Sequence, residues 1–339
     1  MERVAEGEKG SVSIAFVRQA VQALLRRGHD PAPLLLRCNI APALLLSSGA
    51  RVTPESFGAL WLEIATALDD EFFALDARRV KVGSFTTLCH LCLGAADLGG
   101  MLRRLSRFFN ILLDDTAMRV ESAGPDAMLV LRSRLGLETP LRMFAHETLL
   151  VMAHGLACWL VGRRVPVRRA AFAYAEPAWW PEYRSIFCSE LQFDAAETRL
   201  VLSARHLDLP VTQTAASARA FLLGAPANFI LKYRDDRSMA SRLRRRLRSL
   251  PPEAWPSQAA LARELRLGAS TLHRKLAGEG TSLREIRDVL RRDLAIRYLA
   301  ESNLSIGDIG MALGFAEPSA FRRAFKQWTG VRPGEYRRD

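Results

Sequence analysis

The first two thirds of the chain mix helical and strand-like patterns of apolar positions. Apolar residues recur with a helical period over Ser11–Arg27, Phe57–Leu68 and Leu141–Val161. Polar and apolar residues alternate over Met118–Ser122 and Ala127–Ser133, on either side of Gly124-Pro125-Asp126, and again over Ala171–Tyr174 and Arg199–Leu202. The first two alternating stretches predict a hairpin, and the others predict two further strands. Up to about residue 225 the pattern therefore predicts an α+β domain.

From residue 238 onward the pattern is helical throughout. Met239, Leu243, Leu247 and Leu250 recur at i, i+4, i+8 and i+11, which places them on one face of a first helix. Three prolines within 250–256 forbid a continuous helix there, so we expect a loop. A charge-dense stretch at 232–238 separates this region from the α+β part. The sequence thus predicts an N-terminal domain at 10–225, a linker at 226–237 and an all-α domain at 238–339.

The C-terminal domain contains an internal repeat. Residues 261–267 align with 309–315 at an offset of 48, and residues 272–276 align with 321–325 after one extra residue in the turn. Each copy has a short helix, a tight turn and a second helix with the pattern apolar-x-Arg-x-apolar, which is typical of a helix-turn-helix. In each second helix the apolar i, i+4 pair is expected to face the first helix of its own copy.

A long helix is predicted between the two copies. Leu283–Glu301 is 19 residues long and contains neither Pro nor Gly, and Ile286, Leu290, Leu294 and Tyr298 recur on one face. Capping boxes, Ser282-x-x-Glu285 and Ser305-x-x-Asp308, predict where this helix and the next one begin. At a rise of 1.5 Å per residue the helix is roughly 28 Å long. That length suits two recognition helices about 34 Å apart, one DNA turn, so one chain would occupy two successive major grooves.

The positive charge gathers in the same region. The formal net charge is +12, and the residues from 238 to 339 hold 20 Lys and Arg against 11 Asp and Glu, a net of +9. The other 237 residues hold 28 against 25, a net of +3. This asymmetry favours a nucleic-acid-binding domain joined to a nearly neutral one, although an exposed Arg-rich surface with no partner gives the same count.

The C-terminal sequence resembles that of a known family. Asp308–Phe315, Ser319–Lys326 and Thr329-Gly330-Val331-x-Pro333-x-x-Tyr336-Arg337 are similar to the signature of AraC/XylS-type bacterial transcription regulators. The resemblance implies that the second helix of each copy enters the major groove and that RNA polymerase is a partner. Carried over by position, the base-facing candidates are Ser270, His273 and Arg274 in the first copy, and Pro318, Ser319, Arg322 and Arg323 in the second.

The chain departs from the family pattern in both turns. Gly268 and Ala316 stand where a Ser caps each recognition helix, and a side chain that accepts no amide hydrogen weakens a helix start. Arg266 stands where the family has a turn glycine, and Gly310 where it has an alanine. Pro318 has no backbone N–H, so we expect it to shape the start of its helix instead of binding a phosphate.

The N-terminal region resembles the effector domain of one branch of this family, the branch with the arabinose-binding-domain-like module that includes the ornithine-utilisation regulator. The resemblance rests on Leu98-Gly99-x-x-Leu102-Arg103-Arg104-Leu105-x-Arg107-Phe108, Phe172-x-Tyr174-x-x-Pro177, Phe187-Cys188-x-x-Leu191-x-Phe193 and Leu200-Val201-Leu202. It implies a sensing and dimerisation module without identifying a ligand.

Membrane, secreted and enzymatic classes find little support. The longest uncharged apolar runs, 82–96 and 148–162, are shorter than the ~20 residues that span a bilayer, and the charged first ten residues do not read as a signal peptide. Five cysteines, an odd number, favour reduced thiols in a cytoplasm. Phosphate-binding and nucleophile-elbow motifs are absent from the sequence. No cofactor, metal or catalytic residue is predicted.

Three groups of residues could have either a structural or a functional role. Cys89-His90-Leu91-Cys92 has metal-like spacing but lacks a second ligand pair nearby, so we expect buried thiols. His146 and His154 are expected to be polar groups of the core or of a pocket. Trp179, Trp180 and Tyr183 either line a pocket or pack in the core.

The sequence therefore predicts a cytoplasmic, sequence-specific DNA-binding regulator. Its predicted partners are double-stranded DNA, a small-molecule effector and a second copy of the chain. One alternative is a DNA-modifying enzyme of the alkylation-response type, which needs a four-ligand Cys site; Cys38, Cys89, Cys92, Cys158 and Cys188 are scattered for that purpose. The other is a dimeric regulator whose N-terminal domain binds no ligand.

Overall fold

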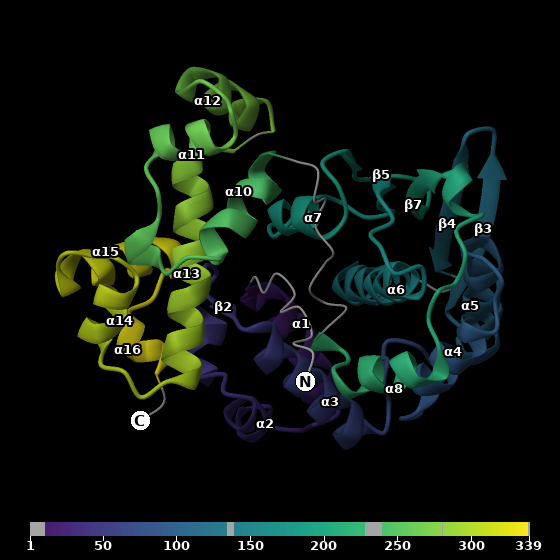
Figure 1. Cartoon of the computed structure of the whole chain (residues 1–339). Coiled ribbons are helices and arrows are strands. Elements are labelled where there is room, and N and C mark those ends of the chain that lie inside the picture. Colours follow the sequence, from purple (N-terminus) through teal and green to yellow (C-terminus); the bar gives the residue numbers. More distant parts are fainter. Residues whose placement is uncertain (1–10, 134–138, 228–238, 280, 338–339) are drawn as a thin grey trace. The chain divides into compact units, whose positions relative to one another are not determined.

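A computed structural model describes residues 11–133, 139–227, 239–279 and 281–337 (Figure 1). Its described residues form two compact units. The central unit comprises residues 15–34 and 57–227, and the C-terminal unit comprises 11–14, 35–56 and 239–337. The structure thus groups Leu35–Ser56 with the C-terminal helices, whereas the sequence placed this segment in the first domain. The predicted linker at 226–237 lies, apart from its first two residues, outside the described residues.

A five-stranded sheet organises the central unit, with strand order β3-β4-β7-β5-β6. The strands are β3 (Thr116–Ala123), β4 (Asp126–Ser133), β5 (Val167–Ala171), β6 (Leu191–Gln192) and β7 (Thr198–Ser203). Neighbouring strands are antiparallel except β5 and β6. The predicted hairpin is confirmed, because Ala123 pairs with Asp126 across the Gly124-Pro125 turn.

One strand was predicted too late in the sequence. The expected strand at 171–174 begins at Val167 and ends at Ala171. The amide of Ala173 donates to the Thr198 hydroxyl at 3.0 Å, so a side chain replaces the backbone partner that would continue the ladder. Phe172 and Tyr174 are nevertheless buried, which explains the alternation seen in the sequence.

The helices between residues 14 and 223 are α1 (Ile14–Arg26), α2 (Ala32–Arg37), α3 (Pro54–Leu68), α4 (Ser84–Leu93), α5 (Leu98–Leu112), α6 (Thr139–Leu160), α7 (Pro181–Ile186) and α8 (Ala215–Leu223), with a 3-10 turn η2 (Ala204–His206). Helix α5 packs against β3 of the sheet and against α4 and α6. The three helices predicted by period correspond to α1, α3 and α6. Helix α6 is long and apolar enough to cross a membrane, but 89% of its apolar window is buried inside the protein, as in the core helix of a globular unit.

The C-terminal unit holds the predicted helical repeat. Its helices are α10 (Met239–Arg248), α11 (Gln258–Glu264), α12 (Ala269–Gly278), α13 (Leu283–Glu301), α14 (Ile306–Ala312), α15 (Pro318–Thr329) and α16 (Pro333–Tyr336), with a 3-10 turn η3 (Pro252–Ala254) in the proline-rich loop. A two-stranded sheet of β1 (Val12–Ser13) and β2 (Arg51–Val52) and a 3-10 turn η1 (Pro42–Leu46) complete the unit. Figure 1 shows α11 and α12 at one end of α13 and α14–α16 along its other half.

Helix α13 has the predicted bounds and the predicted capping box, but its buried face changes along its length. Ile286 and Leu290 lie in the core with α10, α11 and α12. In the second half Leu294 and Tyr298, which continue the row of Ile286 and Leu290, are only half-buried, and Ile296 and Leu299 are buried with Ala295 instead. At about 100° per residue, Leu290 and Leu299 point in opposite directions. The two helix-turn-helix units therefore pack on opposite sides of one helix.

The recognition helices begin without a side-chain cap. The N-cap of α12 is Gly268, as predicted. The N-cap of α15 is Glu317 and not Ala316, because the extra residue of the second turn is Ala316 itself. Pro318 follows at the first helical position, where its missing N–H costs nothing. A stabilising serine cap in the second unit would therefore have to replace Glu317.

Arg266 adopts the backbone conformation that its position demands. Its φ is +55°, and the equivalent residue in the second turn, Gly314, has φ +76°. The left-handed region costs a residue with a Cβ roughly 1–2 kcal/mol, whereas glycine enters it freely. The first turn is therefore strained where the second is not.

We predict that Arg266→Gly raises the free energy of unfolding by about 1 kcal/mol, because it removes this strain. The matched variant Gly314→Ala should lower it by a similar amount, since it introduces the same strain into the second turn. Chemical denaturation of the full chain measures both. A destabilising Arg266→Gly would show that contacts of the Arg266 side chain outweigh the backbone strain.

The core of the central unit contains a buried carboxyl group. Glu147, on α6, accepts hydrogen bonds from Tyr183 Oη, from Trp179 Nε1 at 3.1 Å and from Gln19 Nε2 at 3.4 Å. Burial raises the pKa of Glu147 to about 7, even though these donors favour the charged form. Two of the three aromatic residues noted in the sequence thus serve a core hydrogen-bond cluster.

The folded state binds the Glu147 proton more tightly than the unfolded state, whose pKa is near 4.5. Stability is therefore predicted to fall as the pH rises from about 4.5 to about 7, by up to about 3 kcal/mol. Glu147→Gln should flatten this part of the pH profile, measured by denaturant unfolding between pH 5 and pH 8. The control is Glu197→Gln: hydrogen bonds from Arg119 lower the pKa of the half-buried Glu197 carboxylate, so its loss acts below this range. Parallel profiles for Glu147→Gln and the unmodified protein would contradict the assignment.

Candidate nucleic-acid interface

The seven base-facing candidates lie on the solvent side of α12 and α15. Ser319, Arg322 and Arg323 fall within an arc of about 100°, opposite Phe321 and Phe325. In α12 the equivalent arc holds Ser270, His273 and Arg274, opposite Leu272 and Leu276. All seven candidates, including Pro318 at the start of α15, are exposed. The structure thus brings together the residues of each predicted face.

The charged members of these faces are available to a partner. Within the described ranges, Arg274, Arg322 and Arg323 form no ion pair, and His273 forms no hydrogen bond. Ser319 Oγ donates to Glu317 Oε2 at 3.1 Å, which ties the first turn of α15 to its N-cap residue. Arginines kept free of intramolecular carboxylates can offer their full donor set to a phosphate or a base edge.

Aromatic packing fixes the orientation of α15. Phe321 and Phe325 are fully buried, and their ring centroids lie 5.7 Å apart. The ring centroids of Phe315 and Phe321 lie 5.7 Å apart. The Tyr336 ring of α16 packs edge-on against Phe325, with a centroid distance of 5.0 Å. The predicted role of these apolar pairs is confirmed. Because this face of α15 is buried, the opposite face is exposed to solvent.

One arginine of α13 contacts both helix-turn-helix units. The Arg291 guanidinium lies 5.2 Å from the Trp255 ring centroid and 5.3 Å from that of Phe315, and its Nε donates to the Leu313 carbonyl at 3.0 Å. Burial lowers the pKa of Arg291. The contact joins the proline-rich loop of the first unit to the turn of the second, so the spacing of the two recognition helices is held by more than α13 alone.

The candidates carried over by position from the family signature did not include one residue of the second face, Lys326. Lys326 lies one turn beyond Arg322 and Arg323 on the same arc and is exposed. Its equivalent in α12 is Ala277. Helical periodicity alone, extended by one turn, identifies Lys326. The second face therefore carries the cations Arg322, Arg323 and Lys326, and the first carries Arg274 beside His273.

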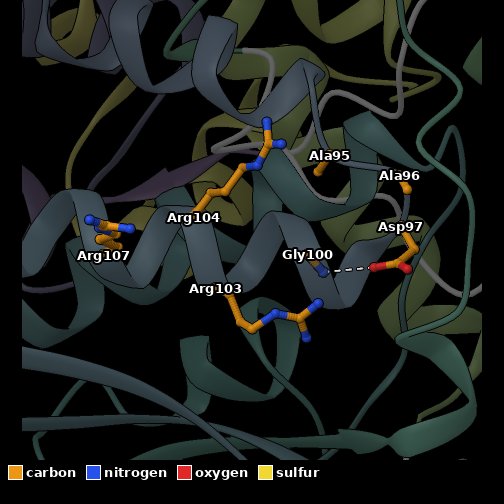
Figure 2. Close-up of a pocket in the computed structure, with 7 residues that line it drawn as sticks. All are labelled: Ala95, Ala96, Asp97, Gly100, Arg103, Arg104 and Arg107. Carbon is orange, nitrogen blue, oxygen red and sulfur yellow. Dashed lines mark hydrogen bonds between the residues drawn. The ribbon is translucent and has the colours of Figure 1, made fainter.

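A pocket on the central unit has a different chemistry. It has a volume of about 400 Å³ and is lined by Arg103, Arg104 and Arg107 of α5 together with Ala95, Ala96, Asp97 and Gly100 (Figure 2). Arg104 Nη1 donates to the Leu91 carbonyl at 2.8 Å, and Asp97 caps α5 by accepting from the Gly100 amide at 2.7 Å. Figure 2 shows Arg103 and Arg104 leaving α5 on opposite sides. The excess of guanidinium groups suits an anionic ligand.

The cysteines Cys89 and Cys92 and the histidines His146 and His154 lie buried in the central unit. Cys89 and Cys92 are buried on α4, and burial raises the pKa of both thiols to about 12. His146 bonds Ser133 and Thr198, and His154 bonds the Val165 carbonyl at 2.7 Å. Across the described ranges, no three His, Cys, Asp or Glu side chains gather as a metal site.

Comparison with known proteins agrees with this arrangement. The family model described as the arabinose-binding domain of AraC transcription regulator, N-term, matches residues 28–211, and a helix-turn-helix domain model matches residues 261–339. The Ornithine utilization regulator of Pseudomonas aeruginosa is 27% identical over 332 residues, 96% of each chain. The regulator VirS of Mycobacterium tuberculosis is 26% identical over 320 residues, 91% of each chain.

Among solved structures, the transcriptional regulator CdpR from Pseudomonas aeruginosa matches 95% of this chain and 97% of its own, at 20% identity and a TM-score of 0.33. The family assignment rests on the first model, which covers more than half of the chain, and on the C-terminal helix-turn-helix match. The chain belongs to the AraC family of transcription regulators and is a DNA-binding regulator with an arabinose-binding-type effector domain.

Proposed function

We propose that this regulator binds double-stranded DNA by placing α12 and α15 in two successive major grooves. The observation that carries the proposal is the pair of exposed recognition faces held by one helix and by the Arg291 contact. Both faces belong to a segment with a net charge of +9, which favours approach to a phosphate backbone. Base contacts from each face would then supply the sequence preference.

The two faces would differ in how they recognise DNA. Arg322 and Arg323 have the geometry to bond the O6 and N7 atoms of a guanine, and Lys326 would add a phosphate contact. In the first unit Arg274 is the one arginine of the face, Ser270 and His273 offer fewer donors, and Ala269 stands where Pro318 begins α15. We therefore expect the second unit to contribute more of the affinity.

Control by a small molecule would come from the central unit. The pocket lined by arginines of α5 supports the proposal that the effector is an anion. The match to an arabinose-binding domain supports the proposal that this domain binds a small molecule. A thermal-shift screen in which no anionic metabolite stabilises the protein would favour the alternative of a ligand-independent scaffold. The homodimer, RNA polymerase and a cytoplasmic location remain part of the proposal, by resemblance to the family.

Arg322→Ala tests base recognition. If Arg322 bonds a guanine, the variant should lose about 1–3 kcal/mol of discrimination at one base pair of the site while its stability is unchanged, because the side chain is exposed. Binding to a library of randomised sites measures this. Arg284→Ala is the control, since Arg284 is 91% exposed on α13 and belongs to neither recognition helix. Equal weakening on every sequence would assign Arg322 to a phosphate.

The isolated segment 238–339 tests the assignment of DNA binding to the C-terminal helices. We expect this fragment to bind DNA and its affinity to fall steeply between 50 and 200 mM salt, roughly tenfold or more, because phosphate contacts release counterions. Fluorescence anisotropy with an operator duplex at several salt concentrations measures both properties. A folded fragment with no DNA binding would contradict the assignment.

A further inference from the structure

A segment that precedes the central unit's sheet in the sequence lies against the second helix-turn-helix. Within the C-terminal unit, η1 contacts α16. Ser47 Oγ donates to the Thr329 carbonyl at 3.0 Å, at the last residue of α15. The Arg51 amide, in β2, donates to Tyr336 Oη at 2.8 Å. Residues 42–52, here called the docking segment, are thus hydrogen-bonded to both helices that follow the second turn.

Two glycines make this close approach possible. Gly330 follows α15 with φ +79°, and a Cβ built on it would lie 2.7 Å from Ser47 Oγ. A Cβ on Gly49 would lie 3.1 Å from the backbone carbonyl of Thr329. A side chain at Gly330 would displace the Ser47 hydroxyl from its hydrogen bond, and one at Gly49 would force a shift of a few tenths of an ångström. The glycine at 330 therefore serves the contact as well as the left-handed C-cap.

A further tether connects the docking segment to α13. The Arg51 guanidinium donates to the Ser11 carbonyl at 2.8 Å and to Ser11 Oγ at 2.6 Å. Ser11 Oγ in turn donates to Asp293 Oδ1 at 2.6 Å. Through β1 and β2 the segment is fixed to α13 and to α15–α16 at once, so it spans the joint between the connecting helix and the second unit.

The docked segment leaves the DNA-facing residues uncovered. Its contacts are with Thr329, Gly330 and Tyr336, at the far end of α15 and in α16, whereas Ser319, Arg322 and Arg323 lie in the first two turns and are exposed. The segment also falls inside the 28–211 match to the effector-domain family. A part of the sensing region therefore contacts the second unit in a form that keeps its recognition face open.

We propose that the docking segment positions the second helix-turn-helix for DNA binding. Ser47, the Arg51 amide and Tyr336 are positioning groups: they touch no DNA and act by fixing α15 and α16 relative to α13. The proposal rests on the proposed role of α15 in base recognition. Displacement of the segment would weaken the contribution of α15 to binding and spare that of α12, since Ser47 and the Arg51 amide form their hydrogen bonds with residues of the second helix-turn-helix unit.

The test uses the full chain and the double variant Ser47→Ala/Tyr336→Phe, which removes both hydrogen bonds and keeps the Tyr336 ring against Phe325. We expect about three- to tenfold weaker binding to an operator duplex, as for the loss of one or two ordinary hydrogen bonds. The loss should appear as relaxed base preference in the half of the site read by α15. Leu46→Ala is the matched control, because Leu46 lies in η1 but is 90% exposed; it should leave binding unchanged.

Hydrogen exchange of the same proteins provides the structural readout. In the double variant the amides of residues 47–52 and of α16 should exchange faster, while those of α12 keep their rates. Faster exchange combined with unchanged affinity and unchanged base preference would overturn the proposal, as would an equal loss of preference in both halves of the site. If the unmodified chain binds no DNA duplex, the proposed function fails instead, so the two failures are distinguishable.

Discussion

The arrangement of the C-terminal unit depends on the burial of opposite sides of a single helix. The first half of α13 buries Ile286 and Leu290 against the first helix-turn-helix, and the second half buries Ile296 and Leu299 against the second. Each unit alone is too small to bury an adequate core, so the shared helix lets both complete one. The orientation of one recognition helix relative to the other follows from the number of residues between these apolar pairs. Insertion of a single residue in α13 would rotate one unit by about 100°.

Much of this was predictable because it is local. Periodicity and capping boxes identified α13 to the residue, and an internal repeat identified both helix-turn-helix units with their buried pairs. The errors also have local causes. The one-residue error at the start of α15 arose because an alignment cannot tell which side of an insertion a cap belongs to. The strand predicted at 171–174 ended early because the Thr198 side chain of β7 accepts from the Ala173 amide.

Interactions between distant segments could not be predicted from the sequence. The composition of residues 35–56 does not reveal their contact with α15 and α16, since the hydrogen bonds involve a serine, a main-chain amide and a tyrosine that are common everywhere. The sandwich of Arg291 between Trp255 and Phe315 was likewise hidden, because its members are separated by 36 and 24 residues. The residues proposed to face DNA came from resemblance to the family, and Lys326 would have followed from the helical period. The buried Glu147 cluster required the fold, since an isolated glutamate in an apolar helix has no sequence-level partner.

The left-handed Arg266 has a consequence for any attempt to improve this protein. Selection for heat resistance alone would favour glycine there, since glycine relieves the backbone at no cost to the core. The same exchange would delete a positive charge from the turn that immediately precedes α12, the recognition helix that is poorer in cations. Under the proposed binding of α12 to DNA, thermostability favours glycine at this position and DNA affinity favours arginine, and a variant enriched by heating would be expected to depend more heavily on its second helix-turn-helix unit.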